Sequence, residues 1–596
     1  MLNHPFRNRK LNPNANAALP KLALLALAAS LSACGGSSHD APDPLQSYRD
    51  QKLAWAGCEK YLPTEQGRAL TQQTGSRLQC VLMRAPKDWA KPESGDIDVA
   101  VMRVAAGDPK ARRGALTFNP GGPGADGLKF GLQLFTVMSA SNPASEQGAL
   151  QLRLVNEYDF VGFSPRGTGF STALNCKTNA MADFIDQSPS GALAPENWAN
   201  VLQNSKATAD ACRADPLTPY INSDATARDM DLLRGLLGDA KLNYFGYSYG
   251  TWLGGWYASL FPDRVGRMVL DSSEDFTSTH EEATLAMGPA RQRIHEQVLL
   301  PYAARHNDYF DLGTDAAAIG RMIESLSPRM QDVLANTLPA ETNTSTNADS
   351  YLNTVVAARG LDAVLATASN PNDGNAIKAA INTHTFVSGN SARNEVIRTV
   401  ATELFDDEYE DRWLDRSDEP LLFLPTYWAV SCNDSKATTD GATWMSISQQ
   451  QIQKAPLTFS AALTNPCLTW GGPNVSKPNV SAMKGLDILM VQSQFDGATP
   501  TEGANRYFAE LSAAKRVYVP GEFSHGIFPY SDNCVDNNVV RYLLGESPKV
   551  RETSCAATPL AQDPKLQSAT ISTYLNPQQA QAQIDEFKNR IGAGRR

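Results

Sequence analysis

Short apolar runs and longer segments of helical periodicity alternate along the first 275 residues and again after residue 485. The runs have strand length, whereas residues 225–237 place apolar side chains at helical spacing. Strands that alternate with helices predict an α/β fold, a mostly parallel sheet with helices on both faces. We expect strands at 80–84, 96–104, 115–119, 158–162, 242–247, 267–271, 486–493 and 516–519, the first two forming an antiparallel pair.

The pattern changes between the two α/β stretches. From about residue 274 the chain is helical, polar and irregular, and segments 341–350 and 369–375 are loop-like. We expect a large, mainly helical insertion that caps the carboxyl ends of the strands. The predicted division is an irregular lead-in at 48–79 that opens a core in two parts (48–275 and 481–560), an insertion (276–480) and a tail (561–596) with a surface helix after Pro577.

The amino terminus has the pattern of an export signal. Basic residues precede a short apolar run at 22–29, and Leu31-Ser32-Ala33-Cys34 follows. Small residues before a cysteine resemble the lipobox of bacterial lipoproteins, in which the cysteine is diacylated and becomes the new amino terminus. We expect a signal peptide at 1–33, a lipid on Cys34 as membrane anchor, and a flexible tether at 34–47.

This interpretation places the protein in the bacterial cell envelope, in the periplasm or at the outer membrane, or released from it. The alternative is an ordinary secretory signal with Cys34 as an incidental thiol.

Composition narrows the class of protein. Of the 596 residues, 42% are apolar and 19% are charged, the balance of a globular protein with a sizeable core. A net charge of −10 without a basic block argues against nucleic acid as a partner. We expect a monomer.

Cysteine usage supports export. Once Cys34 is set aside, eight cysteines are left, an even number that favours a disulfide framework in an oxidising compartment. Eight cysteines allow about 105 pairings, and we predict pairing between sequence neighbours because each bond would close a local loop. None has zinc-ligand spacing with a histidine, and we expect neither metal nor cofactor. The predicted pairs are Cys58 with Cys80, Cys176 with Cys212, Cys432 with Cys467, and Cys534 with Cys555.

One short motif has the strongest chemical signal. The strand-like run from Leu242 ends in Gly246-Tyr247-Ser248-Tyr249-Gly250, and an amphipathic stretch at 251–261 follows. Strand, Gly-x-Ser-x-Gly and helix are the parts of a nucleophile elbow. The turn strains the serine backbone, and a β-carbon at either glycine would collide with a neighbouring element. Ser248 is therefore the predicted nucleophile.

A serine hydroxyl needs a base and an acid that orients the base. Only His525 follows a core strand, where the catalytic groups of α/β proteins gather. Asp496, after the preceding strand, would accept the proton on its Nδ1, and Asp271 is the alternative acid. The other histidines are His4 and His39 before the core, and His280, His295, His306 and His384 in the predicted insertion.

The developing charge on the substrate oxygen needs fixed N–H donors. Tyr249 directly follows the predicted nucleophile and would supply one backbone N–H. Gly121 and Gly122, in the turn after strand 115–119, would supply the other, because a turn without side chains lets the backbone approach the substrate.

The assembled motifs resemble the exported tripeptidyl aminopeptidases, close relatives of the proline iminopeptidases within the α/β-hydrolases. The resemblance spans roughly residues 50–560, with the motifs in the family's order. It lies in Asn119-Pro120-Gly121-Gly122-Pro123-Gly124, Pro165-Arg166-Gly167-Thr168-Gly169-Phe170-Ser171, the elbow, Leu260-Phe261-Pro262-Asp263-Arg264-Val265, Ser431-Cys432-Asn433-Asp434, Cys467-Leu468-Thr469-Trp470, Asp496 and Ser524-His525-Gly526.

Two positions depart from the family pattern. Ser164 stands where the family usually has Asp before Pro-Arg-Gly, and Asn119-Pro120 stands before the glycines where many iminopeptidases have His. Neither belongs to the triad, but both bear on the shape of the pocket and hence on specificity.

The resemblance implies a serine exopeptidase that removes short peptides or a proline from the free amino termini of oligopeptides through an acyl-enzyme. Such an enzyme binds an ammonium group, so carboxylates should face the pocket. The candidates are Glu274, Asp275 and Asp434, with Glu281 and Glu282 behind the first two.

Two other functions stay open. A carboxylesterase or lipase would use the same triad on esters, because the triad sets the reaction and the insertion sets the substrate. The second is a lipid-anchored binding protein on an inactive hydrolase scaffold, against which the complete triad argues.

Overall fold

The structure is a computed structural model that describes residues 43–182, 184–410, 425–530 and 533–564. The predicted signal peptide, residues 34–42 of the predicted tether with Cys34, and the predicted helix after Pro577 lie outside the described residues. The predicted tether ends in a helix, since α1 (Gln46–Arg49) begins within it. Among the helices that are described, none is both long and apolar enough to cross a bilayer.

A nine-stranded sheet forms the centre of the fold, in the order β1-β2-β4-β3-β5-β6-β7-β8-β9. β1 pairs with β2 and β2 with β4 in antiparallel fashion, and every other neighbouring pair is parallel. The strands are β1 Leu78–Pro86, β2 Asp96–Val104, β3 Ala115–Asn119, β4 Asp159–Phe163, β5 Leu242–Tyr247, β6 Val265–Asp271, β7 Ile488–Ser493, β8 Lys515–Val519 and β9 Glu552–Ser554.

All eight predicted strands are present, with ends that shift by a few residues. β9 was missed because its three residues, Glu-Thr-Ser, are polar and lie at the exposed edge of the sheet. The lead-in at 48–79 was predicted to be irregular, but it contains α2 (Glu65–Thr74), which begins where the Thr64 hydroxyl accepts the Gly67 N–H.

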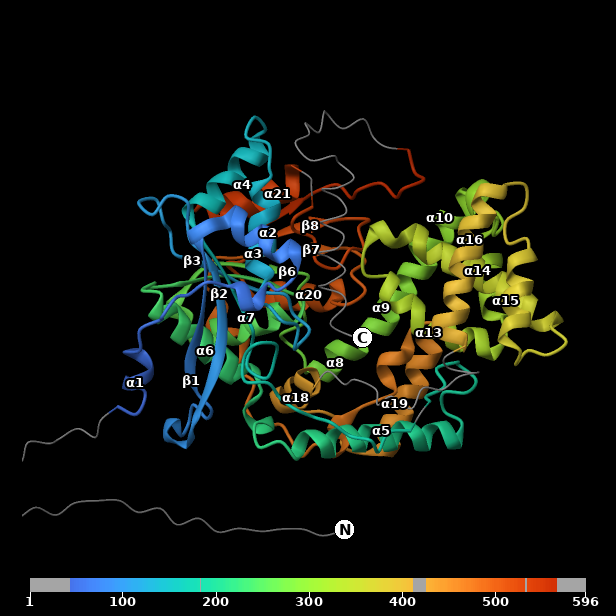
Figure 1. Cartoon of the computed structure of the whole chain (residues 1–596), viewed down its shortest axis with the longest axis horizontal. Helices are drawn as coiled ribbons and strands as arrows, with labels where there is room; N and C mark the ends of the chain where they lie inside the picture. The colour runs from blue at the N-terminus through green and yellow to red at the C-terminus, as the bar shows by residue number, and fades with distance from the viewer. Residues whose placement is uncertain (1–42, 183, 411–424, 531–532, 565–596) are drawn as a thin grey trace, which may run out of the picture. The chain divides into compact units, whose positions relative to one another are not determined.

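Helices cover both faces of the sheet (Figure 1). α3 (Phe130–Ser139), α4 (Glu146–Glu157) and α21 (Asn533–Leu543) pack on one face. α6 (Ser223–Leu236), α7 (Tyr249–Leu260) and α20 (Thr501–Glu510) pack on the other. The prediction that the segment after Ser248 is amphipathic is wrong: residues 249–258 are all buried, because α7 lies between the sheet and α6.

Helices follow one another between β6 and β7, and many of them share an apolar core of their own, to which Leu334, Tyr351 and Ile397 belong. Before them, α5 (Pro195–Arg213) lies between β4 and β5. The α-helices described between β6 and β7 are α8 His280–Leu285, α9 Met287–Ile294, α10 Leu300–Arg305, α11 Asn307–Phe310, α12 Ala316–Glu324, α13 Pro328–Glu341, α14 Ala348–Thr367, α15 Gly374–Thr383, α16 Ser391–Glu403, α18 Pro425–Asp434 and α19 Gly441–Lys454.

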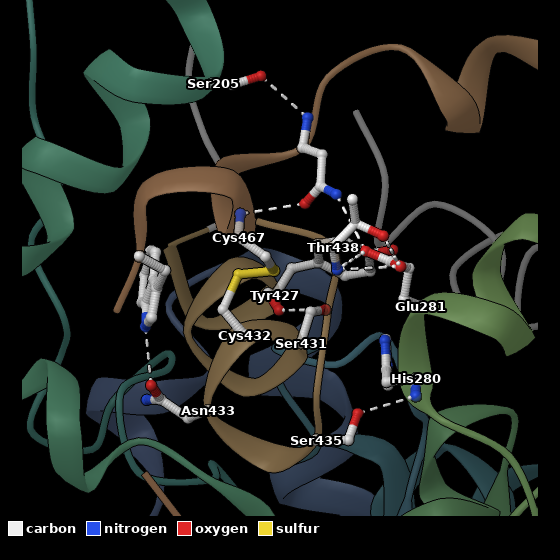
Figure 2. Close-up of a disulfide and its surroundings, with 12 residues drawn as sticks. Ser205, His280, Glu281, Tyr427, Ser431, Cys432, Asn433, Ser435, Thr438 and Cys467 are labelled. Atoms are coloured by element: carbon white, nitrogen blue, oxygen red, sulfur yellow. Dashed lines mark hydrogen bonds between the residues drawn. A yellow bond between two sulfur atoms is a disulfide. The ribbon is translucent and has the colours of Figure 1, made fainter. Parts of the chain in front are cut away.

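Four disulfides staple local loops, and all four follow the predicted pairing: Cys58–Cys80, Cys176–Cys212, Cys432–Cys467 and Cys534–Cys555. They indicate an oxidising compartment and hence an exported protein. Figure 2 shows the disulfide between Cys432 and Cys467, beside the contacts that tie α8 to the chain after α18. There the His280 N–H donates to Ser435 Oγ over 3.0 Å, and the Thr438 hydroxyl donates to Glu281 over 2.7 Å.

A buried ion pair fixes the loop after β4. Arg166 and Asp229 have side chains only 0% and 2% exposed, and two N–H···O bonds of 2.8 and 2.6 Å join them. The remaining N–H groups of the guanidinium donate to the carbonyls of Pro86, Lys87 and Tyr220. All of the polar groups of this pair are thus satisfied, which a buried charge requires.

Removal of one partner of this pair should be costly. We predict that Arg166→Ala lowers the free energy of unfolding by about 3–5 kcal/mol, because Asp229 is left as an uncompensated buried charge. Arg153→Ala is the control: Arg153 is 49% exposed in its pair with Glu157, and its loss should cost less than about 1 kcal/mol. Urea unfolding of the disulfide-intact proteins measures both, and equal effects would contradict the assignment.

Candidate active site

Ser248 lies in the sharp turn between β5 and α7. Its backbone has φ 56° and ψ −128°, a left-handed conformation that is rare for residues with a β-carbon. A β-carbon on Gly246 would lie 2.4 Å from the carbonyl oxygen of Gly250, and one on Gly250 would lie 2.7 Å from that of Asn119. The close approach of β5, α7 and β3 therefore requires both glycines. From 246 to 250 only Ser248 is not fully buried.

The glycine-rich turn after β3 lies against this elbow. A β-carbon on Gly121 would come within 2.6 Å of the Tyr247 carbonyl oxygen and 3.2 Å of the Tyr249 nitrogen. The Gly121 N–H, however, already donates to the Asn119 side chain over 2.9 Å. Of the two glycines predicted from the sequence, Gly122 is thus the better candidate donor. It would act with Tyr249, whose N–H lies at the positive end of α7.

His525 and Asp496 meet beyond the carboxyl ends of β8 and β7. Nδ1 of the ring lies 3.0 and 3.1 Å from the two carboxylate oxygens, and both residues are buried. The N–H groups of Ala498 and Thr499 donate to the same carboxylate over 2.9 and 2.7 Å. Burial alone would raise the pKa of Asp496, but the charge and hydrogen bond of His525 and the two N–H groups hold that pKa below its ordinary value. The carboxylate is therefore ionised at neutral pH and can orient the ring.

Ser248 and His525 are linked through a third residue. In the described part of the chain, Ser248 Oγ forms no hydrogen bond with the His525 ring, and such bonds are often long until substrate binds. The Ser248 N–H donates to the main-chain carbonyl of Asp271 over 3.1 Å. The Asp271 carboxylate accepts the N–H groups of Ile527 and Phe528 over 2.9 and 2.7 Å. Asp271 thus holds the segment after His525 against the elbow, while the ring itself meets Asp496.

Every backbone N–H from residue 523 to 528 has an acceptor. Three of these acceptors belong to no motif and were missed from the sequence: Glu522, Ser272 and Asn343. Ser272 has φ 56°, so a strained backbone again accompanies a site contact. The acceptors are Glu522 for Phe523 and Ser524, Asn343 for His525, Ser272 for Gly526, and Asp271 for Ile527 and Phe528.

The four histidines predicted to lie in the insertion have other partners. His280 lies beside Glu274, and His306 Nε2 lies 2.8 Å from Asp563. His295 contacts the Tyr351 hydroxyl over 2.5 Å, and burial lowers its pKa to about 4. The His384 ring packs against Phe386.

All three carboxylates predicted to bind the substrate amine have partners within the protein. Asp434 is fully buried, accepts the N–H of Ser223 over 2.8 Å and the indole N–H of Trp252 over 3.0 Å, and burial raises its pKa to about 6. Asp275 is bound by Arg506, whose Nη2 lies 2.7 Å from its carboxylate.

Glu274 is the third carboxylate, and its main chain is linked to the elbow. Its N–H donates to Thr251 Oγ1 over 2.8 Å, and that hydroxyl donates to the Ser248 carbonyl over 2.6 Å. Its carboxylate lies 3.6 Å from His280 Nε2. The rings of Tyr249, Trp252 and Tyr427 surround His280, with centroids 5.6–6.4 Å away.

The unusual Ser164 has a carboxylate as its neighbour. Its hydroxyl donates to Asp126 over 2.7 Å, and Asp126 follows the glycine-rich turn in the sequence. A carboxylate therefore lies beside this position although the chain has no aspartate there. Asp126 could have been noticed in the sequence, because it comes only two residues after the glycine-rich motif that ends at Gly124.

A surface hollow of ≈ 630 Å³ lies at the amino ends of the parallel strands, lined among others by Arg113, Lys241 and Arg267. This edge of the sheet is opposite to the one that ends in Ser248, Asp496 and His525. The hollow therefore takes no part in the candidate site.

Two family profiles match the chain. The profile described as "alpha/beta hydrolase fold" covers residues 114–312, and the profile described as "TAP-like protein" covers residues 455–555. The first contains the glycine-rich turn and the elbow, and the second contains Asp496 and His525.

Characterised relatives cover most of the chain. A tripeptidyl aminopeptidase of Streptomyces coelicolor is 30% identical over 493 residues, 81% of this chain and 84% of that protein. Serine protease Hip1 of Mycobacterium tuberculosis is 25% identical over 522 residues, 85% of this chain and 91% of that protein. Carboxylesterase B of Mycobacterium tuberculosis is 28% identical over 523 residues, 84% of this chain and 90% of that protein.

Solved structures are more distant. A proline iminopeptidase of Mycobacterium smegmatis is 14% identical with a TM-score of 0.29, over 78% of this chain and 97% of that chain. At this score the likeness carries no argument. The sequence relatives do carry one: the chain belongs to the tripeptidyl aminopeptidase family of α/β-hydrolases and is a serine hydrolase of the peptidase kind.

Proposed function

We propose that this protein is an exopeptidase that releases short peptides of the tripeptidyl type, or a proline, from the free amino termini of oligopeptides. The observation that carries the proposal is the contact of His525 Nδ1 with the Asp496 carboxylate, 3.0 Å away, beyond the strand ends where the strained Ser248 also lies. The tripeptidyl aminopeptidase of Streptomyces coelicolor, 30% identical, supports the substrate class.

The proposed reaction is acyl transfer. Ser248 Oγ attacks the carbonyl carbon of the scissile peptide bond while His525 takes its proton, and the ionised Asp496 stabilises the imidazolium that forms. The N–H groups of Tyr249 and Gly122 bind the oxyanion. His525 then protonates the leaving amine, and water, deprotonated by the same ring, releases the amino-terminal peptide from the acyl-enzyme.

The substrate ammonium would bind Glu274. Of the three carboxylates considered, Asp275 is bound by Arg506 and Asp434 is fully buried. The main chain of Glu274 is two hydrogen bonds from the Ser248 carbonyl through Thr251, and its carboxylate, 3.6 Å from His280 Nε2, is 10% exposed.

We also propose that Cys34 is diacylated and anchors the protein in the cell envelope, as the lipobox-like sequence before it indicates. Two acyl chains hold a protein stably on a membrane. An unlipidated secreted enzyme is the alternative.

Single substitutions should show whether Asp496 or Asp271 is the acid of the triad. We predict that Ser248→Ala abolishes fluorophosphonate labelling, and that Asp496→Asn lowers kcat/KM about 10³–10⁴-fold with an unchanged unfolding midpoint. Asp271→Asn should instead lower the unfolding midpoint, because one of its two bonds to the segment after His525 is lost. Labelling that persists in Ser248→Ala, or full activity in Asp496→Asn, would refute the triad.

Chromogenic substrates should separate an aminopeptidase from an esterase. We predict cleavage of free Ala-Ala-Pro or Pro amides and little cleavage of the same amides acetylated at the amino terminus. Equal cleavage of blocked amides, or a preference for simple esters, would favour the carboxylesterase.

A charge substitution locates the amine site within that experiment. Glu274→Gln should raise KM for the free amides at least about tenfold, as expected when a charged hydrogen bond is lost, and leave ester hydrolysis nearly unchanged. Glu282→Gln is the matched control, because Glu282 caps α8 through Thr279 at an exposed position. Equal effects of the two substitutions would remove Glu274 from the amine site.

Metabolic labelling tests the anchor. We predict that the protein incorporates labelled palmitate in a bacterial host and is found in the membrane fraction, and that Cys34→Ser abolishes both. A soluble, unlabelled wild-type protein would show that the anchor is absent.

A further inference from the structure

A short polar segment between α13 and α14 contacts the loop that carries His525. This segment, Thr342–Ser345, is called the strap below. The sequence predicts only a loop at 341–350, but Thr342 and Thr344 are buried. The strap belongs to the helical region between β6 and β7, far in sequence from the His525 loop.

The backbone N–H groups of the His525 loop, residues 523–528, donate partly to the core and partly to the strap. Residues 523 to 528 have six successive N–H groups, and core side chains accept five of them. The sixth belongs to His525 itself and donates to the carbonyl oxygen of Asn343 over 2.7 Å. A buried N–H without an acceptor is costly. The core therefore leaves the main chain of His525 incomplete, and the strap completes it.

Side chains fasten the strap beside this bond. The Ser345 N–H donates to Ser524 Oγ over 3.0 Å, and the two serine hydroxyls lie 3.1 Å apart. The Ser524 carbonyl in turn accepts the Ser493 hydroxyl over 2.8 Å, which connects the strap to the end of β7. Ser524, directly before His525, is thus held from the strap on one side and from the sheet on the other.

The same region of helices also touches the loop of Asp496. A β-carbon on Gly497 would lie 2.9 Å from Ile294 and 3.0 Å from Arg291, both on α9, and 3.5 Å from the carbonyl oxygen of Thr342. Gly497 therefore allows α9 and the strap to lie directly on the residue after Asp496. Both loops of the Asp496–His525 pair are in contact with elements from outside the sheet core.

We propose that the strap is a positioning element of the active site: it fixes the main chain at His525 and stays docked during turnover. The proposal rests on the proposed role of His525 as the base. The physical reason is geometric. The ring must hold one nitrogen on Asp496 and present the other to Ser248, so a small rotation of the backbone at 525 would misalign both. On this account the helical region has a second role besides selecting substrates.

The test loosens the strap without touching the triad. Because the acceptor at Asn343 is a main-chain oxygen, the variants are Ser345→Ala, Ser524→Ala and the double substitution. We expect each single variant to lower kcat and the rate of fluorophosphonate labelling of Ser248 about five- to tenfold, the loss expected for one hydrogen bond. KM should change less than about twofold. The double variant should be little worse than Ser524→Ala, since both substitutions break the same link.

Controls make the outcome specific. Ser350→Ala removes a hydroxyl that donates to Glu341 within the same helical region, and this variant should be labelled at the wild-type rate. Ser345→Thr keeps the hydroxyl and should restore most of the rate lost in Ser345→Ala. If wild-type protein is not labelled, the proposed triad fails. If wild-type protein is labelled and both Ser345→Ala and Ser524→Ala are labelled as fast as wild type, the strap proposal fails while the proposed triad stands.

A crosslink tests whether the strap stays docked. Cysteines at positions 345 and 524 replace two hydroxyls 3.1 Å apart, which is close enough for a disulfide after a small adjustment. We expect the oxidised double-cysteine variant to keep at least about half of the activity of its reduced form. An oxidised form that is inactive and recovers on mild reduction, under conditions that leave wild type unchanged, would show that the strap must leave and would overturn the proposal.

Discussion

The arrangement of the site depends on the hydrogen bonds that the buried residue Asp271 accepts. Its main-chain carbonyl accepts the N–H of the strained Ser248, and its side chain accepts the two N–H groups that follow Gly526. One residue at the end of β6 therefore fixes the elbow and the His525 loop to each other, although nearly half of the chain separates Ser248 from His525 in the sequence. Without an acceptor there, two buried N–H groups would lose their partners at a cost that the fold would avoid by moving the loop.

Much of this could be predicted from the sequence because the signals are local. Gly246 and Gly250 indicate the elbow, because a β-carbon at position 246 would clash with the Gly250 carbonyl and one at position 250 with the Asn119 carbonyl. Ser248, Asp496 and His525 could be found because each of them follows the end of a strand that is recognisable in the sequence: β5, β7 and β8. The disulfides were predictable because each joins cysteines 21–36 residues apart, and such short loops leave few competing partners.

The rest could not be predicted because it consists of contacts between distant segments. Nothing near Ser272 indicates a left-handed residue, and its hydroxyl has a role only because Gly526 lies next to it in space. The loop-like composition of the strap does not indicate that Asn343 accepts the His525 N–H. The burial of α7 on all sides, by contrast, was missed although the sequence contains the signal, since residues 249–260 have no charged side chain. Asp434 illustrates the converse: a carboxylate predicted to face substrate is an acceptor inside the core.

The most direct measurement of the central claim is a crystal structure of the enzyme after reaction with a peptidyl phosphonate. The account predicts a phosphorus–oxygen bond at Ser248 and a phosphoryl oxygen bound by the N–H groups of Tyr249 and Gly122. It also predicts His525 Nε2 within about 3 Å of the Ser248 oxygen, with Nδ1 still on Asp496. A phosphonate on another residue, or a His525 ring turned away from Ser248 in the adduct, would contradict it.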